Sequence, residues 1–239
     1  MTDAFLEQDA AIDLRLASCD WTDIQKDMDR QGWSVLSGLL PIEITDCLAL
    51  LWDSARFRSR IIMERYAFGR GEYRYFTYPL PPVIQTLRHS LYPHLAVIAN
   101  RWNRMLGMEY IYPAGHAEFL ARCHAEGQSR PTPLMLNYKE SDYCCLHQDL
   151  YGPVNFPIQA VALLTDTFTG GELVLTHQGR DEFKADVVPL RRGDIVLFAV
   201  NERPTCGRRG YVRVKMRHGV SEIRSGHRRT LGIIFHDAR

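Results

Sequence analysis

From about Pro131 to its end, the sequence is a succession of short apolar runs separated by turn residues. The runs are rich in β-branched and aromatic residues, and they are Leu134–Tyr138, Tyr143–Asp149, Gln159–Thr165, Glu172–His177, Ile195–Val200, Tyr211–His218 and Thr230–His236. Gly-Gly, Gly-Asp and Ser-Gly dipeptides separate several of them, at 170–171, 193–194 and 225–226. Short strands at this spacing predict an antiparallel sandwich or a jelly-roll barrel.

The first 130 residues have a mainly helical pattern. Helices are predicted at 23–31, from Pro41 to about Trp52 and at 83–106, with one strand at 33–36. Pro93 is expected to break or kink the third helix, and Gly107 to end it. Helices first and strands later predict an α+β fold, in which the N-terminal helices buttress one side of the β core. We expect a single domain over residues 1–239, mainly helical over 1–130 and with its β core at 131–239.

Composition narrows the class of protein. The chain has 239 residues, of which 46% are hydrophobic and 24% charged, and this excludes a disordered, collagen-like or coiled-coil chain. No apolar run approaches the roughly 18 residues of a membrane span. The start of the sequence lacks a basic region followed by an apolar stretch, so we expect no secretory signal. These features predict a soluble, cytoplasmic protein and leave its oligomeric state open.

The net charge of +1 conceals an uneven distribution. Residues 1–53 carry 11 acidic and 3 basic side chains, whereas residues 180–239 carry 14 basic and 7 acidic ones. A basic region of this kind is suited to binding a polyanion. The alternative is that the acidic N-terminal segment packs against the basic part and neutralises it.

A His-Gln-Asp sequence ends the second apolar run. His147 and Asp149 are two residues apart, so on a strand their side chains project from the same face. With His218 as a third ligand from a distant strand, they would form the two-histidine, one-carboxylate set that non-haem Fe(II) oxygenases use. The alternative is a structural histidine capped by an aspartate. His227 and His236 are the rival third ligands, but we expect His227 to face outward and His236 to lie in the core.

An arginine that could bind a carboxylate follows the third candidate ligand. Arg228 lies ten residues after His218, where the next strand can carry it into the barrel to form a bidentate pair with a carboxylate. Thr230 shares that face and adds a hydroxyl. Arg229 is expected to face the other way.

The order of these residues resembles that of the Fe(II)/2-oxoglutarate dioxygenase superfamily. The resemblance covers about residues 130–239 and implies a double-stranded β-helix (jelly-roll, cupin-like) core. It also implies that Fe(II) is held by His147, Asp149 and His218, that 2-oxoglutarate and O₂ are cosubstrates, and that Arg228 binds the far carboxylate of 2-oxoglutarate.

Residues 134–149 resemble the alkylated-DNA repair dioxygenases more narrowly. In those enzymes a tyrosine nine residues before the metal histidine contacts the cosubstrate, which implies this role for Tyr138. The chain departs from them at Leu136, where they have asparagine, and the spacing of Arg228 is closer to that of prolyl hydroxylases. The sequence is also similar, at 57–76, 127–134, 147–152, 217–221 and 231–238, to a bacterial family assigned as oxygenases of damaged nucleic acid.

A basic and aromatic segment precedes the β core. Residues 56–76 contain six arginines and six aromatic residues but only two glutamates. Arginines bind phosphates and aromatic rings stack on unpaired bases, so the segment is a candidate for binding single-stranded or damaged nucleic acid. The candidate substrate residues are Arg58, Arg74, Tyr73, Tyr75 and, just past the metal ligands, Tyr151. The alternative is a structural segment that covers the barrel mouth.

Together these features predict an Fe(II)- and 2-oxoglutarate-dependent dioxygenase that oxidatively demethylates alkylated DNA or RNA bases. One alternative keeps the chemistry and changes the target to a protein side chain or a small molecule. Another is a non-catalytic binding module on the same fold, although the complete set of candidate ligands disfavours it.

Overall fold

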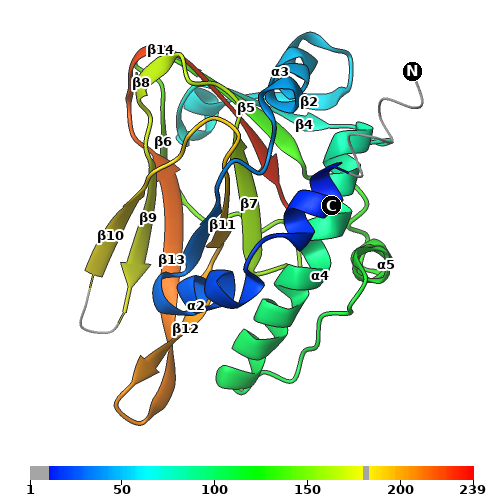
Figure 1. The fold of residues 1–239 in the computed structure, drawn as a ribbon, viewed down its shortest axis with the longest axis vertical. Helices are drawn as coiled ribbons and strands as arrows, with labels where there is room; N and C mark the ends of the chain where they lie inside the picture. The colour runs from blue at the N-terminus through cyan, green and yellow to red at the C-terminus, as the bar shows by residue number, and fades with distance from the viewer. Residues whose placement is uncertain (1–10, 180–182) are drawn as a thin grey trace.

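The computed structural model describes residues 11–179 and 183–239 (Figure 1). Residues 11–17 are helical. The helices that follow are α2 (Trp21–Gln31), α3 (Ile42–Leu50), α4 (Pro82–Met105) and α5 (His116–Ala125), with 3₁₀ turns η1 (Leu51–Asp53) and η2 (Met63–Tyr66). Its strands are β1 (Trp33–Leu36), β2 (Phe57–Ile62), β3 (Gly69–Arg70), β4 (Glu72–Phe76), β5 (Leu134–Lys139), β6 (Tyr143–His147), β7 (Ile158–Leu163), β8 (Phe168–Gly170), β9 (Leu173–Gln178), β10 (Phe183–Val188), β11 (Ile195–Ala199), β12 (Glu202–Gly207), β13 (Gly210–Val220) and β14 (Ile223–Ile233).

The strands form two antiparallel sheets. The first has the order β1-β11-β7-β14-β5-β4-β2, with β8 paired to β14, and the second has the order β10-β9-β13-β6-β3, with β12 paired to β13. Strands far apart in the sequence therefore lie side by side, which is the arrangement of a jelly roll. The predicted α+β fold with a jelly-roll core is confirmed.

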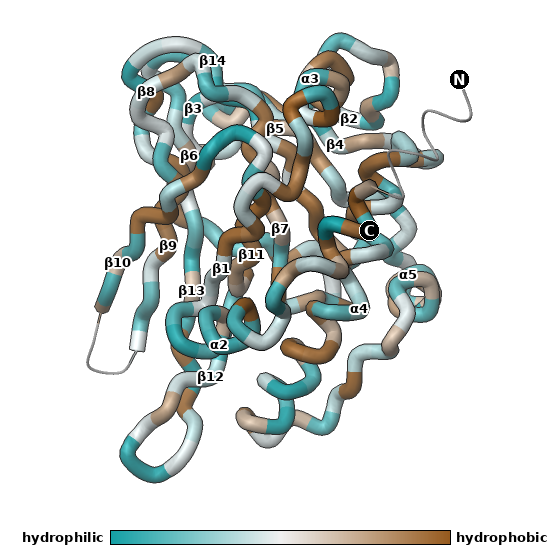
Figure 2. Tube along the Cα trace, in the orientation of Figure 1, coloured by the Kyte–Doolittle hydropathy of each residue, from teal (hydrophilic) through white to brown (hydrophobic). Residues whose placement is uncertain are grey.

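Helices cover the first sheet from one side, as Figure 1 shows for α4 and α5. Tyr92 of α4 is fully buried, and its ring centroid lies 5.0 Å from that of Phe156 and 6.2 Å from that of Phe235. The most hydrophobic parts of the trace include β7 and β11 at the centre of the first sheet (Figure 2). The N-terminal helices thus pack against one face of the first sheet, and the opposite face of that sheet lines a cavity.

The helix at 82–105 does not break at Pro93. This residue is exposed, while Leu91, Tyr92 and Leu95 around it are buried. Packing on both sides of the proline holds the two halves in one helix, although one backbone hydrogen bond is lost. Of the expected break or kink at Pro93, the break is therefore excluded.

The basic and aromatic segment before the long helix was not expected to contain strands, and it contains three, β2, β3 and β4. β2 and β4 pair with each other, and β4 extends the first sheet by pairing with β5. Three further strands, β8, β10 and β12, were not predicted, and β14 begins at Ile223 rather than Thr230. β4 and β8 pair with the distant strands β5 and β14, which a local pattern does not contain, whereas β10 and β12 form hairpins with the neighbouring β9 and β13.

Part of the charge asymmetry is neutralised inside the molecule. Asp46 of the acidic segment pairs with Arg192, and Asp29 pairs with Arg101. Within the described ranges, no helix is both long enough and apolar enough to cross a membrane.

Candidate metal centre

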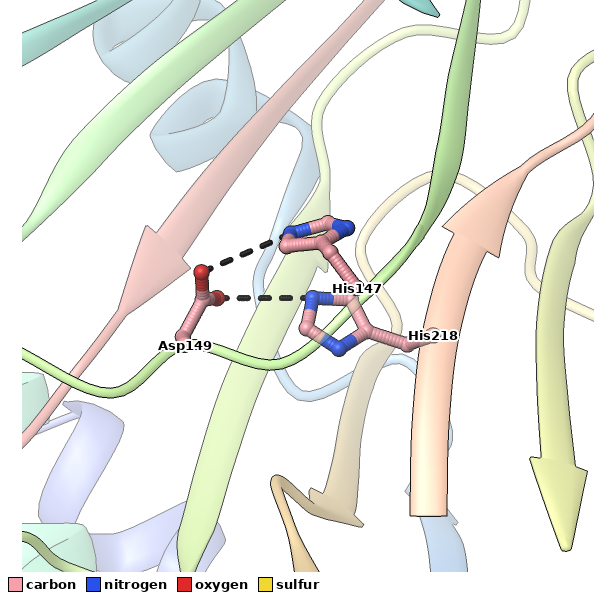
Figure 3. A group of neighbouring side chains, drawn as sticks. All are labelled: His147, Asp149 and His218. Atoms are coloured by element: carbon pink, nitrogen blue, oxygen red, sulfur yellow. Dashed lines mark ion pairs between the residues drawn. The ribbon is translucent and has the colours of Figure 1, made fainter. Parts of the chain in front are cut away.

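Two neighbouring strands bring the candidate histidines together. His147 ends β6 and lies directly opposite His218 of β13 in the antiparallel pairing, with ring centroids 4.2 Å apart. Asp149 follows β6 by two residues, and its side chain points at both rings (Figure 3). The pairing of β6 with β13 thus joins residues that are 71 positions apart.

The donor atoms face a common centre. The Nε2 atom of His147 is 3.4 Å from Oδ1 of Asp149, and Nε2 of His218 is 3.4 Å from Oδ2 of the same carboxylate. One ligand atom from each residue lies within 4.8 Å of the others, and no second group of this kind occurs among residues 11–179 and 183–239. Two imidazoles and one carboxylate on one side of a metal leave positions open for a cosubstrate. This donor set fits Fe(II).

Hydrogen bonding orients the ligands. Nδ1 of His147 is 2.8 Å from the carbonyl oxygen of Cys145, so Nδ1 donates to that oxygen and Nε2 is the ring nitrogen that faces the centre. Burial lowers the pKa of His147, but the contacts with Asp149 and Cys144 outweigh it and raise the pKa to about 11. Burial raises the pKa of Asp149, but the two histidines hold it well below its usual range. The carboxylate is therefore charged and ready to bind a cation.

The residue between the two ligands anchors the turn. The Gln148 amide donates to Oδ1 of Asn201 at 2.7 Å and to the carbonyl oxygen of Met216 at 2.7 Å. The ligand-bearing turn is thus bonded to β13 independently of the metal ligands.

Two tyrosine hydroxyls extend the hydrogen-bond network from the Asp149 carboxylate. The Tyr151 hydroxyl donates to Oδ1 of Asp149 at 2.7 Å, and the Tyr75 hydroxyl donates to that of Tyr151 at 3.0 Å. Burial raises the pKa of both tyrosines well above the ordinary value, so they remain neutral donors. Both were predicted to contact substrate, and the structure places them in a hydrogen-bonded chain that ends on Asp149.

A buried arginine lies in the same cavity. Arg228 of β14 is 2% exposed, and its guanidinium makes no hydrogen bond or ion pair with any described residue. Burial lowers the pKa of its guanidinium to about 10, so the group remains charged. The hydroxyl of Tyr138, on the adjacent β5, is also buried without a partner. A buried, unpaired cation is costly, and a carboxylate would relieve that cost.

The two arginines of β14 face opposite sides, as predicted. Arg229 donates to Oδ1 of Asn137 at 2.9 Å and to the carbonyl oxygen of Ala49 at 3.0 Å, outside the cavity. Thr230 faces the cavity with Arg228. Gly171 makes room for Arg228, because a Cβ atom there would lie 2.9 Å from its Cδ atom, and its φ of +65° also favours glycine.

A single cavity of about 260 Å³ contains all of these groups. It lies between the two sheets, and the candidate ligands, the two tyrosines and the buried arginine line it. The rival histidines are elsewhere: His227 is exposed, and His236 is buried with its Nδ1 atom accepting from the backbone N–H of Phe156. The geometry thus collects the candidate cofactor and cosubstrate residues in one place.

The predicted substrate arginines are bonded within the protein. Arg74 donates to Glu72 and to the carbonyl oxygen of Trp52, and its guanidinium carbon lies 4.1 Å from the Trp52 ring centroid. Arg58 donates to the carbonyl oxygen of Pro131 and lies over the Tyr75 ring. Tyr73 lines the cavity.

Among the cavity residues that were not predicted is a buried glutamine. Gln159, at the start of the otherwise apolar β7, is buried and has no hydrogen-bond partner for its Oε1 atom. Its side chain lines the same cavity. The sequence signal that could have identified it is a glutamine within an apolar run that the pattern predicts to be fully buried.

Comparison with known proteins adds the family. A family model described as an oxygenase catalysing oxidative methylation of damaged DNA matches residues 71–238. An uncharacterised protein of Mycobacterium tuberculosis strain CDC 1551 is 44% identical over 167 residues, which are 68% of this chain and 72% of that protein. The chain belongs to this oxygenase family. The expectation of an oxygenase related to damaged nucleic acid is therefore confirmed at the level of the family.

Solved structures similar to this oxygenase share its fold. A prolyl-4-hydroxylase of Pseudomonas putida has a TM-score of 0.55 and 14% identity, with 92% of this chain and 99% of that chain covered. A 2-oxoglutarate–Fe(II) oxygenase-family oxidoreductase of Burkholderia pseudomallei has a TM-score of 0.54 and 15% identity, with 92% and 94% covered. A Trichoplax adhaerens prolyl hydroxylase, in complex with a peptide fragment of hypoxia inducible factor, has a TM-score of 0.56 and 13% identity, with 89% and 86% covered. The family model thus identifies an oxygenase, and the chain has the fold of these hydroxylases and of the 2-oxoglutarate–Fe(II) oxygenase-family oxidoreductase.

Proposed function

We propose that this oxygenase removes N-methyl groups from alkylated DNA or RNA bases. In this proposal His147, Asp149 and His218 hold Fe(II), while Arg228, Tyr138 and Thr230 hold 2-oxoglutarate. When bound, Fe(II) with 2-oxoglutarate and O₂ supplies the oxidation that hydroxylates a methyl group, after which the carbon leaves as formaldehyde. The description of the family supports damaged DNA as the substrate class.

One observation carries the cofactor assignment. The cavity has a ligand-ready carboxylate between two histidines in one part and an unpaired, buried guanidinium in another. A dicarboxylate with a keto group can bind the metal at one end and Arg228 at the other. The Tyr138 hydroxyl, which lacks a protein partner, is then available to donate to the same carboxylate.

The protein contributes position and exclusion of water. Tyr151 holds one oxygen of Asp149, and Cys145 fixes the ring orientation of His147. The apolar walls formed by residues such as Leu136 and Val161 shield the reacting carbon from solvent. Because the cavity lies between two sheets, a base in a duplex cannot reach it without flipping out, so the proposed substrate is unpaired or flipped.

The test is turnover on defined oligonucleotides. Purified protein with Fe(II) and 2-oxoglutarate should release succinate and formaldehyde in equal amounts when an N-methylated oligonucleotide is added. The unmethylated oligonucleotide is the control, since it should release no formaldehyde. The demethylase proposal fails if no methylated DNA or RNA, single- or double-stranded, stimulates 2-oxoglutarate turnover.

A second candidate function is hydroxylation of a protein side chain. Two observations favour it: Arg228 lies ten residues after His218, a spacing closer to that of prolyl hydroxylases, and prolyl hydroxylases are among the similar folds. Peptide-stimulated turnover that produces succinate without formaldehyde would support this function instead.

A further inference from the structure

Two exposed aromatic residues lie beside the cavity in the turn at residues 63–70, which comprises η2, β3 and the two residues between them. Tyr66 is 57% exposed and Phe68 is 43% exposed, and their rings are inclined by only 21° with centroids 6.1 Å apart. Phe68 also lines the cavity that contains the candidate metal ligands, so the pair begins at the cavity mouth and continues outward. Exposed, nearly parallel rings at a cavity mouth do not serve the core.

The backbone beneath these rings is held in place. The N–H of Cys145 in β6 donates to the Phe68 carbonyl oxygen at 2.8 Å, and the N–H of Met63 donates to that of Gly71 at 3.0 Å. Gly69 has a φ of +118°, and a Cβ atom there would lie 2.4 Å from the carbonyl oxygen of Tyr143. The turn is therefore fastened to the strand that ends in His147, and the rings have a fixed position relative to the candidate metal centre.

The arginines of this turn differ from those of the flanking strands. Arg65 is exposed and makes no ion pair with the described parts of the chain, and Arg70 is 55% exposed with only a long contact of 3.7 Å to Glu64. By contrast, Arg60 and Arg74 both bind Glu72 at 2.6–2.7 Å. An exposed ion pair at long range contributes little, so Arg65 and Arg70 can exchange solvent for phosphate groups.

We infer that the turn at residues 63–70 is the platform on which this oxygenase binds single-stranded nucleic acid. Tyr66 and Phe68 stack on the bases next to the one that enters the cavity, and Arg65 and Arg70 contact the flanking phosphates. The inference rests on the proposed function, because it assumes a nucleic-acid substrate. The contact residues therefore differ from the sequence-based candidates Arg58, Arg74 and Tyr75, whose side chains are bonded within the protein.

The chemistry of the turn favours nucleic acid over a peptide. One common mode of peptide recognition adds an extended peptide to a sheet edge through main-chain hydrogen bonds. Here the edge strand β3 has only two residues and the Phe68 carbonyl is already bonded to β6, whereas two ring faces and two guanidinium groups are exposed. These are the groups that bind successive bases and phosphates of a single strand, with little preference for sequence.

The experiment measures binding to two single strands of equal length by fluorescence anisotropy. One strand carries bases and a single N-methylated base, and the other is abasic at the positions flanking the central nucleotide. Tyr66→Ala and Phe68→Ala should each weaken binding to the base-containing strand by about 5- to 150-fold, the range measured for loss of one base–aromatic stack. The same variants should bind the abasic strand as the wild type does, because that strand has no flanking base to stack.

Matched variants separate stacking from folding. Tyr66→Phe keeps the ring and should retain wild-type binding, whereas Tyr211→Ala removes a similarly exposed tyrosine (51%) from another part of the molecule and should change nothing. Arg65→Gln should weaken binding to both strands equally and reduce the slope of log affinity against log salt by about 0.7, the contribution of one phosphate contact on a single strand.

Three results would overturn the inference. If the wild type binds the strand and Tyr66→Ala and Phe68→Ala bind it equally well, the platform is elsewhere and the proposed function stands. If these two variants lose affinity equally for base-containing and abasic strands, the rings support the fold rather than stack. If the wild type binds no oligonucleotide but is stimulated by a peptide, both the platform and the nucleic-acid substrate are rejected.

Discussion

At the metal end of the cavity, the Asp149 carboxylate is contacted by His147, His218 and Tyr151. At the other end, the Arg228 guanidinium and the Tyr138 hydroxyl have no partner in the parts of the chain that the structure describes. Both ends are buried and polar, so the difference lies in whether the protein itself completes the hydrogen bonds. The metal end is stable without a ligand, whereas the arginine end is stabilised only when an anion enters.

This difference predicts opposite responses to mutation. Removing a polar group at the metal end breaks contacts that the ligand-free protein makes, so both stability and function should fall. Removing one at the arginine end breaks no hydrogen bond or ion pair in the ligand-free protein, so function should fall while stability is kept or rises.

The largest effect is expected at the metal end. Replacing His218 by Ala removes one of three candidate ligands, and succinate release should fall below detection, because two ligands do not hold Fe(II) in the required geometry. The control is His227→Ala, which changes an exposed histidine on β14, the next strand along the chain, and should retain turnover. The reverse result would mean that His227, not His218, is the third ligand.

The next effect concerns the arginine end. Arg228→Met should weaken 2-oxoglutarate binding by about 2–5 kcal/mol, or about 30- to 5,000-fold, when measured by calorimetry with Fe(II) or an inert metal. The same variant should be as stable as the wild type without ligand or more stable, by up to about 4 kcal/mol, because it replaces an unpaired buried charge.

Arg229→Met is the matched control for this prediction. It breaks hydrogen bonds to Asn137 and Ala49, so it should lower the free energy of unfolding and leave 2-oxoglutarate binding unchanged. If both variants are destabilised and both bind 2-oxoglutarate normally, the contrast between the two ends of the cavity is wrong.

A pair of tyrosines tests the same contrast with one atom removed at each end. Tyr151→Phe deletes the donor to Asp149 and should weaken metal binding by about 10- to 100-fold, as loss of an outer-shell partner of a metal ligand does. It should also lower the free energy of unfolding by about 1 kcal/mol. Titration with Fe(II) or Co(II) and urea denaturation measure the two effects, and unaltered metal affinity would remove Tyr151 from the metal site.

The smallest effect is expected for Tyr138→Phe. Its hydroxyl has no partner, so its removal should leave the free energy of unfolding unchanged or raise it. Affinity for 2-oxoglutarate should fall by about 0.5–1.5 kcal/mol, the contribution of one hydrogen bond. A loss of stability equal to that of Tyr151→Phe would show that the two ends do not differ.

The sequence predicted the β core well because its strands carry their own signals. Runs such as Gln159–Thr165 and Ile195–Val200 are apolar on both faces and end in turn residues, so tertiary context was not needed to find them. The resemblance of the His-x-Asp, His and Arg order to a known superfamily then gave the three candidate ligands and Arg228. The structure brings those residues into one cavity.

The segment at 57–76 was harder to interpret because its role depends on distant partners. The sequence alone does not distinguish Arg74 from Arg65. Only Arg74 contacts Glu72 and the Trp52 ring, because β4 pairs within the sheet. Tyr75 reaches Asp149 only through Tyr151. A local pattern identifies the residue types, whereas cross-strand pairing decides which of them remain free.

The direct opposition of His147 and His218 across β6 and β13 also limits how the chain can vary in length. Side chains alternate between the two faces of a strand, so inserting or deleting one residue between Tyr211 and Arg217 would turn His218 to the outer face unless the strand bulged. An even change would preserve the face but shift the pairing. The turn between Gly207 and Gly210 lies beyond the strand pairing, so it can lengthen freely. Length variation in relatives that keep the activity should therefore concentrate in this hairpin turn rather than in β13.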